Sequence, residues 1–312
     1  MRTTEQHKQR AEQARPPFRI AGIGEVLWDH FPTGKRLGGA PLNFCYHCQQ
    51  FGAESYPISS VGTDLAGDEL LRALEARGIP RDYVFRSDAH PTGKVDIRID
   101  TTGSHAFTIH RDTAWEHLTR RPAIDTLAAQ IDALCFGTLG LLNPVTRLTL
   151  KHFLMSVPET AWIIFDINLR QQLYNKASIL ESLEACHVLK ISDDELPQLV
   201  EMLAIHGSTD EQLLQIMHRF NLKLIAYTRG ANGSLLITPE ARHEHSGIDV
   251  TAVNTVGAGD SFTATLCIGL LAGVPLQEIN ESANHVGAFV CTQDSATPAL
   301  PEALLTRVSD SE

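Results

Sequence analysis

The sequence predicts an α/β fold in which a doubly wound, mostly parallel sheet carries a small β-strand lid. Four compact apolar segments have the composition of strands buried on both faces, and helical patterns separate most of them. They lie at 133–142, 161–170, 186–195 and 222–230. Two further segments, 94–100 and 105–111, instead alternate apolar and polar residues. This alternation is typical of an antiparallel hairpin with one exposed face, and we expect that hairpin to form the lid.

The N-terminal half opens with strand and helix patterns in alternation. Residues 18–31 predict one buried strand that ends in an acid, and residues 41–51 predict the helix that follows it. Residues 55–64 predict the next strand, and residues 68–79 have leucines and alanines at helical spacing. Gly78 lies where that helix is expected to stop. These elements predict the first βα units of the sheet.

The C-terminal part predicts an antiparallel edge and a long buried helix. In 228–238, a Gly-Ala-Asn-Gly turn signal stands between two strand-like runs and indicates a hairpin. The stretch NTVGAGDSF at 254–262 leads directly into an apolar helical run that ends at Gly273. The residues from Gly257 to Gly259 are therefore expected at the N-terminus of a helix.

The composition indicates one large domain that acts on small molecules. The chain has 312 residues, a formal net charge of -11 and a pI of about 5.7, which argue against a surface for nucleic acids or acidic membranes. The segment 1–17 lacks the apolar core of a signal peptide, and no segment reaches the roughly 18 apolar residues of a membrane span. Six scattered cysteines do not resemble a disulfide framework. We expect a disordered polar tail at 1–17, a domain at 18–312 and a cytoplasmic protein without nucleic-acid or membrane partners.

Several short motifs have a structural explanation that is stronger than a chemical one. Cys45 and Cys48 form a C-x-x-C, but no second pair accompanies them, and in a helix they share one face for packing. The HEH run at 243–245 lacks further metal ligands, so we expect a solvated turn before a strand. After the GIG at 22–24, Leu27 occupies the position of the third glycine in a dinucleotide fingerprint. Both TGK triplets lack the rest of a Walker loop, so a nicotinamide site and a P-loop are disfavoured.

The stretch at 254–262 carries the strongest chemical signal. Backbone amides at a helix N-terminus bind anions, and glycines let a phosphate approach without hindrance from a Cβ. As a helix cap, Asp260 would contribute about 0.5–2 kcal/mol to stability. An aspartate beside an anion site also suits phosphoryl transfer to a hydroxyl. With an ordinary pKa of about 3.9, it is ionised at neutral pH and can accept the hydroxyl proton.

The chain resembles the ribokinase/PfkB family of carbohydrate kinases, and within it the fructokinase branch. The family signature D-T-x-G-A-G-D-x-F is matched here by NTVGAGDSF. Other family motifs follow in order over nearly everything after the tail: GEVLWD, GGAPLNF, VGTDLAGDEL, DINLR, KISDDEL, TRGANGS and SATPALP. GGAP, DINLR and KISDDEL look most like fructokinases. The resemblance implies a ribokinase-like, Rossmann-type fold with lid strands around 29–41 and 91–113.

The resemblance also implies roles for individual residues. It makes Asp260 the catalytic base and gives the amides of Gly257, Ala258 and Gly259 to the transferred phosphate. The positions that match the family's sugar site are Asp29, Gly38, Gly39, Asn43, Arg111, Asn168 and Arg170. Those that match its ATP site are Thr228, Gly230, Gly257, Gly259 and Asn284. A turn cap for Asp29 and ion pairs for Arg111 and Arg170 are the structural alternatives.

Two departures from the family pattern bear on the cations. Glu195 matches the glutamate of an N-x-x-E that organises Mg²⁺ through water, although Ser192 stands in the asparagine position. Mg²⁺ dependence is still expected. Asn254 and Val256 replace an Asp and a Thr that help to form a monovalent-cation site in many members. Losing a charge and a hydroxyl weakens such an oxygen cage, so strong K⁺ activation is doubtful.

The resemblance implies an ATP- and Mg²⁺-dependent kinase that phosphorylates a primary hydroxyl of a small sugar, with fructose and its 6-hydroxyl preferred. Kinases of 2-keto-3-deoxygluconate, of other sugar acids or of nucleosides are alternatives within the family. A noncatalytic sugar-binding regulator is an alternative from another class, against which the intact Asp260 argues. Lid strands in this family often pair edge to edge, so a homodimer is expected.

Overall fold

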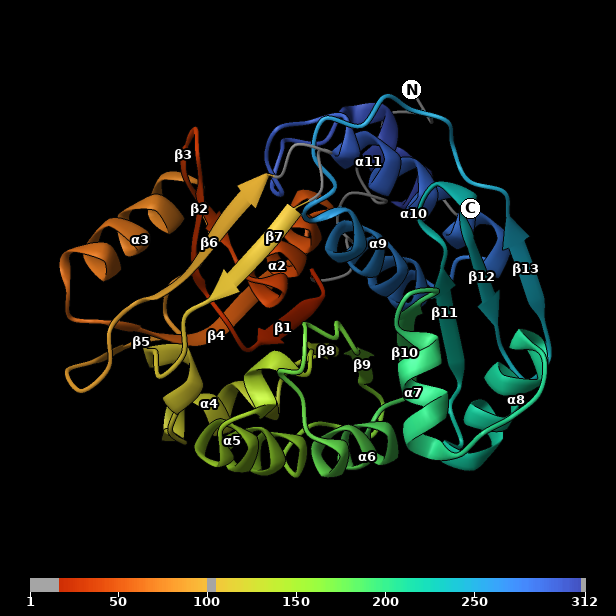
Figure 1. Cartoon of the computed structure of the whole chain (residues 1–312), viewed down its shortest axis with the longest axis horizontal. Helices are drawn as coiled ribbons and strands as arrows, with labels where there is room; N and C mark the ends of the chain where they lie inside the picture. Colours follow the sequence, from red (N-terminus) through yellow and green to blue (C-terminus); the bar gives the residue numbers. More distant parts are fainter. Residues whose placement is uncertain (1–16, 100–104, 310–312) are drawn as a thin grey trace, which may run out of the picture.

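Two β-sheets organise the chain, a nine-stranded central sheet and a four-stranded lid (Figure 1). The computed structural model describes residues 17–99 and 105–309. The tail predicted at 1–17 lies outside these residues except for Pro17, and so does the hairpin turn predicted at 101–104. Among the residues described, no helix is both long enough and apolar enough to cross a membrane.

The central sheet is parallel except at one edge. Its strands run in the order β13-β12-β11-β10-β9-β8-β1-β4-β5. Their bounds are β1 (Arg19–Ile23), β4 (Glu54–Gly62), β5 (Val84–Ser87), β8 (Ala133–Phe136), β9 (Trp162–Asp166), β10 (Val188–Ser192), β11 (Leu224–Thr228), β12 (Ser234–Ile237) and β13 (Arg242–His245). Strand β12 pairs antiparallel with β11 and with β13, which confirms the predicted antiparallel edge.

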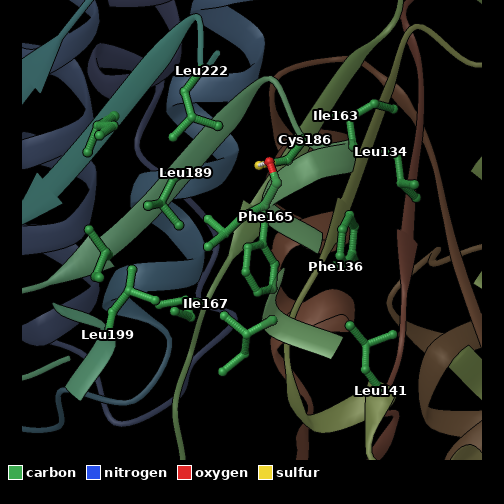
Figure 2. Close-up of a cluster of buried hydrophobic side chains, with 14 of the residues drawn as sticks. Leu134, Phe136, Leu141, Ile163, Phe165, Ile167, Cys186, Leu189, Leu199 and Leu222 are labelled. Atoms are coloured by element: carbon green, nitrogen blue, oxygen red, sulfur yellow. Dashed lines mark hydrogen bonds between the residues drawn. The ribbon is translucent and has the colours of Figure 1, made fainter. Parts of the chain in front are cut away.

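Helices cover both faces of the central sheet because its inner strands are apolar on both sides. In β8, Leu134 and Phe136 belong to the core on one face, and Ala133 and Cys135 belong to the core on the other. Figure 2 shows the first core, in which the rings of Phe136 and Phe165 stack 5.3 Å apart. It is covered by α4 (Pro122–Ala128), α5 (Pro144–Leu154), α6 (Lys176–Ala185), α7 (Leu196–Leu203) and α8 (Thr209–Phe220). The opposite core is covered by α2 (Ala40–Gln50), α9 (Ala258–Ala272) and α10 (Leu276–Cys291), with α11 (Glu302–Ser309) packed on α10.

The lid sheet has the order β3-β2-β6-β7. Its strands are β2 (Leu27–Phe31), β3 (Gly34–Gly38), β6 (Gly93–Ile99) and β7 (His105–Ile109). Strands β6 and β7 pair antiparallel, as predicted for the hairpin. Successive side chains of β2 point to opposite faces: Leu27 packs with Val95 of β6, whereas Trp28 packs with Leu70 of helix α3 (Leu65–Ala76). Asp29 therefore shares the face of Leu27.

Two predictions about strands are wrong. The single strand predicted at 18–31 is two strands in two sheets, because the chain leaves the central sheet after Ile23 and passes through Gly24 at φ 147°. Asp29 consequently lies within β2 of the lid rather than at the end of the first strand. The HEH run at 243–245 belongs to edge strand β13 rather than to a turn, and the His243 carbonyl accepts a hydrogen bond from Asn280 of α10 at 3.0 Å.

Two predictions about α2 and α9 are confirmed. Cys45 and Cys48 are free thiols buried in the core between α2 and the central sheet, so they pack rather than bind metal. Helix α9 begins after Gly257 and ends before Gly273, and both glycines have left-handed φ values, 86° and 72°. The apolar run after Asp260 is the buried helix that the sequence predicts.

Candidate active site

Two cavities adjoin each other at the carboxyl ends of the central strands, the usual ligand position in an α/β sheet. The lid cavity, of about 450 Å³, lies between the lid and the N-terminus of α9. The outer cavity, of about 420 Å³, lies between the ends of β10 and β11 and helix α10. Some residues line both cavities, so ligands in the two would meet at these residues. They are Asn168, Arg170, Lys190, Asp194, Thr255 and Gly259.

The N-terminus of α9 stands at this junction. Gly257 lines the lid cavity, Ala258 lines the outer cavity and Gly259 lines both. Gly257 has a left-handed φ of 86°, and a Cβ on it would lie 2.6 Å from the Cβ of Ala296, so only glycine fits. The Ala258 amide donates a long hydrogen bond of 3.3 Å to the Thr255 carbonyl. The positive end of the helix dipole faces the junction, where it favours an anion.

The carboxylate of Asp260 lies in the wall of the lid cavity, one residue beyond Gly259. Its Oδ2 atom accepts a hydrogen bond of 2.8 Å from Nδ2 of Asn43 on α2. Burial, together with the charge of Asp166, raises the pKa of Asp260 to about 6, against the opposing effects of Asn43, Lys190 and Arg170. This pKa is higher than the ordinary aspartate value of about 3.9 expected from the sequence. The raised value keeps it mostly ionised at neutral pH and makes it a stronger proton acceptor.

Two more carboxylates, those of Asp29 and Glu25, line the lid cavity. Both side chains are buried, and burial raises the pKa of each to about 7. The charge of Asp260 contributes to both shifts, whereas Arg170 opposes them. Glu25 also accepts a hydrogen bond of 3.2 Å from the Ala40 amide at the start of α2. The lid cavity thus has several hydrogen-bond acceptors and a pronounced negative charge.

A buried ion pair lies below the α9 N-terminus. Lys190 Nζ of β10 lies 3.1 Å from Asp166 Oδ1 at the end of β9, and the Thr263 hydroxyl of α9 donates to the same carboxylate at 2.9 Å. The negative charges of Asp166 and Glu195 raise the pKa of Lys190 against the lowering effect of its burial. A Cβ on Gly259 would lie 3.1 Å from Lys190 Nζ. The ammonium group therefore reaches the helix N-terminus and lines both cavities.

The loop after β9 brings Asn168 and Arg170 to the junction, where both line the two cavities. Asn168 has a left-handed φ of 43°, a conformation that asparagine tolerates better than most residues. Its carbonyl accepts a hydrogen bond of 3.2 Å from the Thr138 hydroxyl. The Arg170 side chain is exposed toward the cavities, where its positive charge partly offsets the rise in the pKa of Asp29 and of Asp260.

The outer cavity brings together four of the five positions that match an ATP site, whereas Gly257 lines only the lid cavity. Thr228 ends β11 and Gly230 follows it. Asn284 faces them from α10, where its Nδ2 atom donates to the Ser234 hydroxyl at 2.7 Å. Glu195 also lines this cavity. Its buried carboxylate accepts hydrogen bonds of 2.8 Å from the amides of Leu169 and Ser192.

A model described as pfkB family carbohydrate kinase matches residues 25–303, a span that includes every residue lining the two cavities. The chain belongs to the pfkB family of carbohydrate kinases. The sequence-predicted family is therefore confirmed. Among curated proteins, the fructokinase of Solanum tuberosum is 26% identical over 303 residues, which cover 90% of this chain and 92% of that one.

Solved structures share the fold of this pfkB kinase. An uncharacterized sugar kinase from Pyrococcus horikoshii has a TM-score of 0.79 and 24% identity, covering 93% of this chain and 99% of that one. The fructokinase from Xylella fastidiosa, solved with bound ATP, has a TM-score of 0.80 and 20% identity, covering 93% and 98%. The predicted ribokinase-like α/β fold is thus confirmed.

Gly38 and Arg111, which match the sugar site of the family, line neither cavity of this pfkB kinase. Gly38 instead leaves room for the Asp29 carboxylate, because a Cβ on it would lie 2.2 Å from Oδ2 of Asp29. The neighbouring Gly39 does line the lid cavity, in a left-handed conformation with φ 113°. The Arg111 guanidinium pairs with buried Glu116 at 2.7 Å, the ion pair that was its structural alternative.

We expect Gly38→Ala to impair sugar binding selectively, because the new methyl group must displace the Asp29 carboxylate. The KM for the sugar should rise by about tenfold or more, since a site built for hydroxyl groups loses a hydrogen-bonding partner. The KM for ATP should stay near the wild-type value, because Gly38 lies away from the outer cavity. Steady-state kinetics with each substrate varied in turn measures both constants. Gly34→Ala is the matched lid control: its Cβ would contact nothing, although its φ of 130° strains the turn.

Four residues at the site were not predicted from the sequence: Glu25, Asp166, Lys190 and Asp194. Each belongs to a motif that was quoted, but none was assigned a role. Lys190 carried a usable signal, since a lysine within the apolar run of a buried strand needs a buried partner. Its partner Asp166 ends the neighbouring strand β9, which only the strand order of the sheet reveals.

The lid contacts the body of the kinase at both of its edge strands. On β3, Arg36 donates to the Asp294 carbonyl and pairs with the Asp294 carboxylate at 3.1 Å. The same carbonyl accepts a hydrogen bond of 3.4 Å from Asn254, which precedes the α9 N-terminus. On β7, the Phe107 carbonyl accepts a hydrogen bond of 2.7 Å from Gln171, which follows Arg170. The loop after β9 is therefore bonded directly to the lid, whereas the loop before α9 is connected to it through the shared partner Asp294.

Proposed function

We propose that this kinase transfers the γ-phosphate of ATP to the 6-hydroxyl of fructose and uses Mg²⁺. The observation that carries the proposal is the meeting of the two cavities at the N-terminus of α9, with the carboxylate of Asp260 on the lid side. A sugar in the lid cavity and a nucleotide in the outer cavity would meet beside a group able to take up a proton. This is the geometry that phosphoryl transfer to a hydroxyl requires.

The residues of the outer cavity fit ATP and Mg²⁺. Lys190, Arg170 and the first-turn amides of α9 supply positive charge for phosphate groups. Asp194 offers carboxylate oxygens at the junction, and Glu195 retains lone pairs for a metal-bound water. When bound, Mg²⁺-ATP supplies the phosphoryl group and the metal charge that offsets its negative charge.

The residues of the lid cavity fit a polyhydroxylated acceptor. Asp29 and Glu25 accept hydrogen bonds from hydroxyl groups, and Asp260 takes the proton of the attacking hydroxyl. Asn43 holds one oxygen of Asp260 at 2.8 Å and leaves the other for the substrate. The apolar lid face, which includes Leu27 and Phe107, limits the access of water to the reacting groups.

The charge of the lid cavity favours a neutral sugar over a sugar acid. Four carboxylates line it, those of Glu25, Asp29, Asp194 and Asp260. The cations are Arg170 and Lys190, and Lys190 is already paired with Asp166. An additional carboxylate on the substrate would raise the local repulsion that already elevates the pKa of Asp29. Relatives also support fructose: one is the fructokinase of Solanum tuberosum, and a structural neighbour, the fructokinase from Vibrio cholerae, was solved with fructose and ADP.

A panel of acceptors tests the substrate assignment. With Mg²⁺-ATP, the kcat/KM measured from ADP release should be at least about tenfold higher for fructose than for ribose, 2-keto-3-deoxygluconate or adenosine. The product should be fructose 6-phosphate. A preference for the acid would overturn the charge argument while leaving a kinase. Saturable fructose binding without ADP release from any acceptor would instead indicate a sugar-binding regulator.

We also propose that turnover depends little on K⁺. Both polar atoms of the Asn254 side chain already have hydrogen-bond partners. Its Oδ1 atom accepts from the Val256 amide at 3.0 Å, and its Nδ2 atom donates to the Asp294 carbonyl. The uncharged side-chain amide of Asn254 thus links the loop before α9 to the segment that contains Asp294. The kcat in K⁺ and in a bulky organic cation, compared at equal ionic strength, should agree within about twofold. Several-fold activation by K⁺ would contradict the proposal, and Asn254→Asp is expected to increase K⁺ dependence.

We also propose that the chain forms a homodimer through its lid. The outer edge of β3 lacks a paired strand among the described residues, and such an edge can accept a strand from another chain. Sedimentation equilibrium of the full chain should give twice the monomer mass, and a monomer at all concentrations would reject the proposal.

A further inference from the structure

A cluster of two histidines and one aspartate lies at the root of the lid, outside both cavities. His90 precedes β6, Asp112 follows β7, and His117 ends the 3₁₀ helix η1 (Ala114–His117) of the body. One donor atom from each side chain lies within 4.8 Å of the other two, and no other set of three His, Cys, Asp or Glu side chains in the described residues meets this condition. We propose that this cluster, called the root cluster here, is a binding site for a divalent transition metal such as Zn²⁺.

The distances in the root cluster suit tetrahedral coordination. His90 Nδ1 lies 3.4 Å and His117 Nε2 lies 2.8 Å from the same oxygen, Oδ1 of Asp112. Zinc lies about 2.0–2.2 Å from nitrogen and oxygen ligands, so neighbouring ligand atoms of a tetrahedral site are separated by about 3.3 Å. The separation of 3.4 Å lies close to this value, whereas the separation of 2.8 Å is a hydrogen-bond distance that metal binding would lengthen. Small side-chain rotations would bring all three donors to one ion.

The two rings lie next to each other, and one must turn for both to bind an ion. The imidazoles of His90 and His117 stack with their centroids 3.5 Å apart and their planes 5° apart, and because each nitrogen lone pair lies in its ring plane, one ring has to rotate before both nitrogens face the same ion. Two adjacent imidazolium cations would repel each other, whereas two neutral rings can both donate lone pairs to a metal ion. Asn143, within 3.4 Å of both ring nitrogens of His117, supplies a polar neighbour that can orient this ring.

The chemistry of the donors selects the class of ion. Imidazole suits zinc, copper, nickel and iron, whereas Mg²⁺ and Ca²⁺ prefer sites made only of oxygen. The Asp112 side chain is 79% exposed and the two histidines are about one quarter exposed. A fourth position therefore remains open to water, as it does in three-ligand zinc sites.

The position of the root cluster predicts what a bound ion would do. Both connections between the lid hairpin and the body pass through it, one at His90 and one at Asp112, and His117 belongs to the body. Beside it, Trp115 packs so closely on Gly93 that a Cβ there would lie 2.5 Å from the indole ring. An ion would cross-link the two connections to η1 and restrict the opening of the lid root.

Zinc binding to the full chain tests the proposal directly. After treatment with a chelator, the protein is titrated with Zn²⁺ by calorimetry in the absence of nucleotide. The wild type should bind about one equivalent at this site, and His117→Ala should weaken that binding by at least about tenfold. His110→Ala is the matched control, because this lid histidine shares Asp96 with His30, yet the donor atoms of these three side chains do not all lie within 4.8 Å of one another. Its Zn²⁺ affinity should equal that of the wild type.

Hydrogen exchange provides a second readout that does not depend on activity. Zn²⁺ should slow exchange in residues 88–92 and 110–118 of the wild type, and it should have no such effect in His117→Ala. Should the alanine variant fail to fold, His117→Gln retains a side chain of similar size without the imidazole. Absence of Zn²⁺ binding by the wild type would overturn the proposal. Wild-type affinity in both the His90→Ala and the His117→Ala variants would overturn it as well, since the ion would then be bound elsewhere, for example by the active-site carboxylates.

Discussion

Asp260→Asn is expected to reduce kcat by roughly two to four orders of magnitude while leaving the binding of both substrates nearly unchanged. The amide has the shape of the carboxylate and can still accept the hydrogen bond from Asn43, but it cannot take up a proton. Dissociation constants for ATP and fructose should stay within about threefold of the wild type, because the loss concerns a step after binding. Calorimetry and single-turnover kinetics measure the two effects separately.

The matched control for this variant is Asp210→Asn, which alters an exposed aspartate paired with Arg242 far from the cavities. Its turnover should equal that of the wild type. Turnover within about tenfold of the wild type in Asp260→Asn would remove Asp260 from the role of base.

The same group should determine the acid limb of the pH profile. Asp260 must be ionised to accept a proton, and burial raises its pKa to about 6. The kcat/KM of the wild type should therefore fall as the pH decreases through about 6. It should reach its plateau only well above 7, because the pKa of Asp29 is about 7. A profile measured between pH 5 and 8 that shows no loss of kcat/KM below pH 6 would contradict the assignment.

The second large effect is expected from Lys190→Met, in both stability and turnover. Removing the ammonium leaves Asp166 buried beside Thr263 without its charged partner, and breaking a buried pair in this way typically costs about 3–5 kcal/mol. The kcat should decrease about 100-fold or more, because Lys190 lines both cavities at the point where charge is transferred. Denaturant unfolding and steady-state kinetics measure the two losses.

A double variant distinguishes the structural role of Lys190 from its role in turnover. In Lys190→Met with Asp166→Asn, no unpaired charge remains buried, so most of the lost stability should return. Turnover should stay low, because the positive charge at the junction is still absent. If the double variant regained wild-type turnover, Lys190 would act only through the stability of the fold.

Local patterns were sufficient to predict the elements that carry the phosphate chemistry. The glycines before Asp260, the apolar run after it and the stop at Gly273 together predict α9, because each is required by backbone geometry at a helix end. The alternation in 94–100 and 105–111 likewise predicts the lid hairpin. These features depend on neighbours in sequence, so they are visible without the fold.

Features that depend on distant segments could not be predicted in this way. The strands on either side of Gly24 are both buried, so the apolar pattern does not reveal that they belong to different sheets. The pairing of Lys190 with Asp166 requires the order of β9 and β10, and the raised pKa values of Glu25 and Asp29 require the closed lid cavity. Arg111 matched a sugar-site position, yet its nearby partner Glu116 holds it outside both cavities.

The division of the lid cavity into two kinds of wall has a consequence for engineering. The lid contributes Leu27, Val95, Phe107 and Ile109, whereas the groups proposed to act on the phosphate belong to the body. Residues of the first kind can be exchanged without altering α9 or the pair of Lys190 with Asp166. Variants with a new acceptor specificity can therefore be sought among substitutions on β2, β6 and β7. The residues proposed to act on the phosphate stay unchanged in such a library.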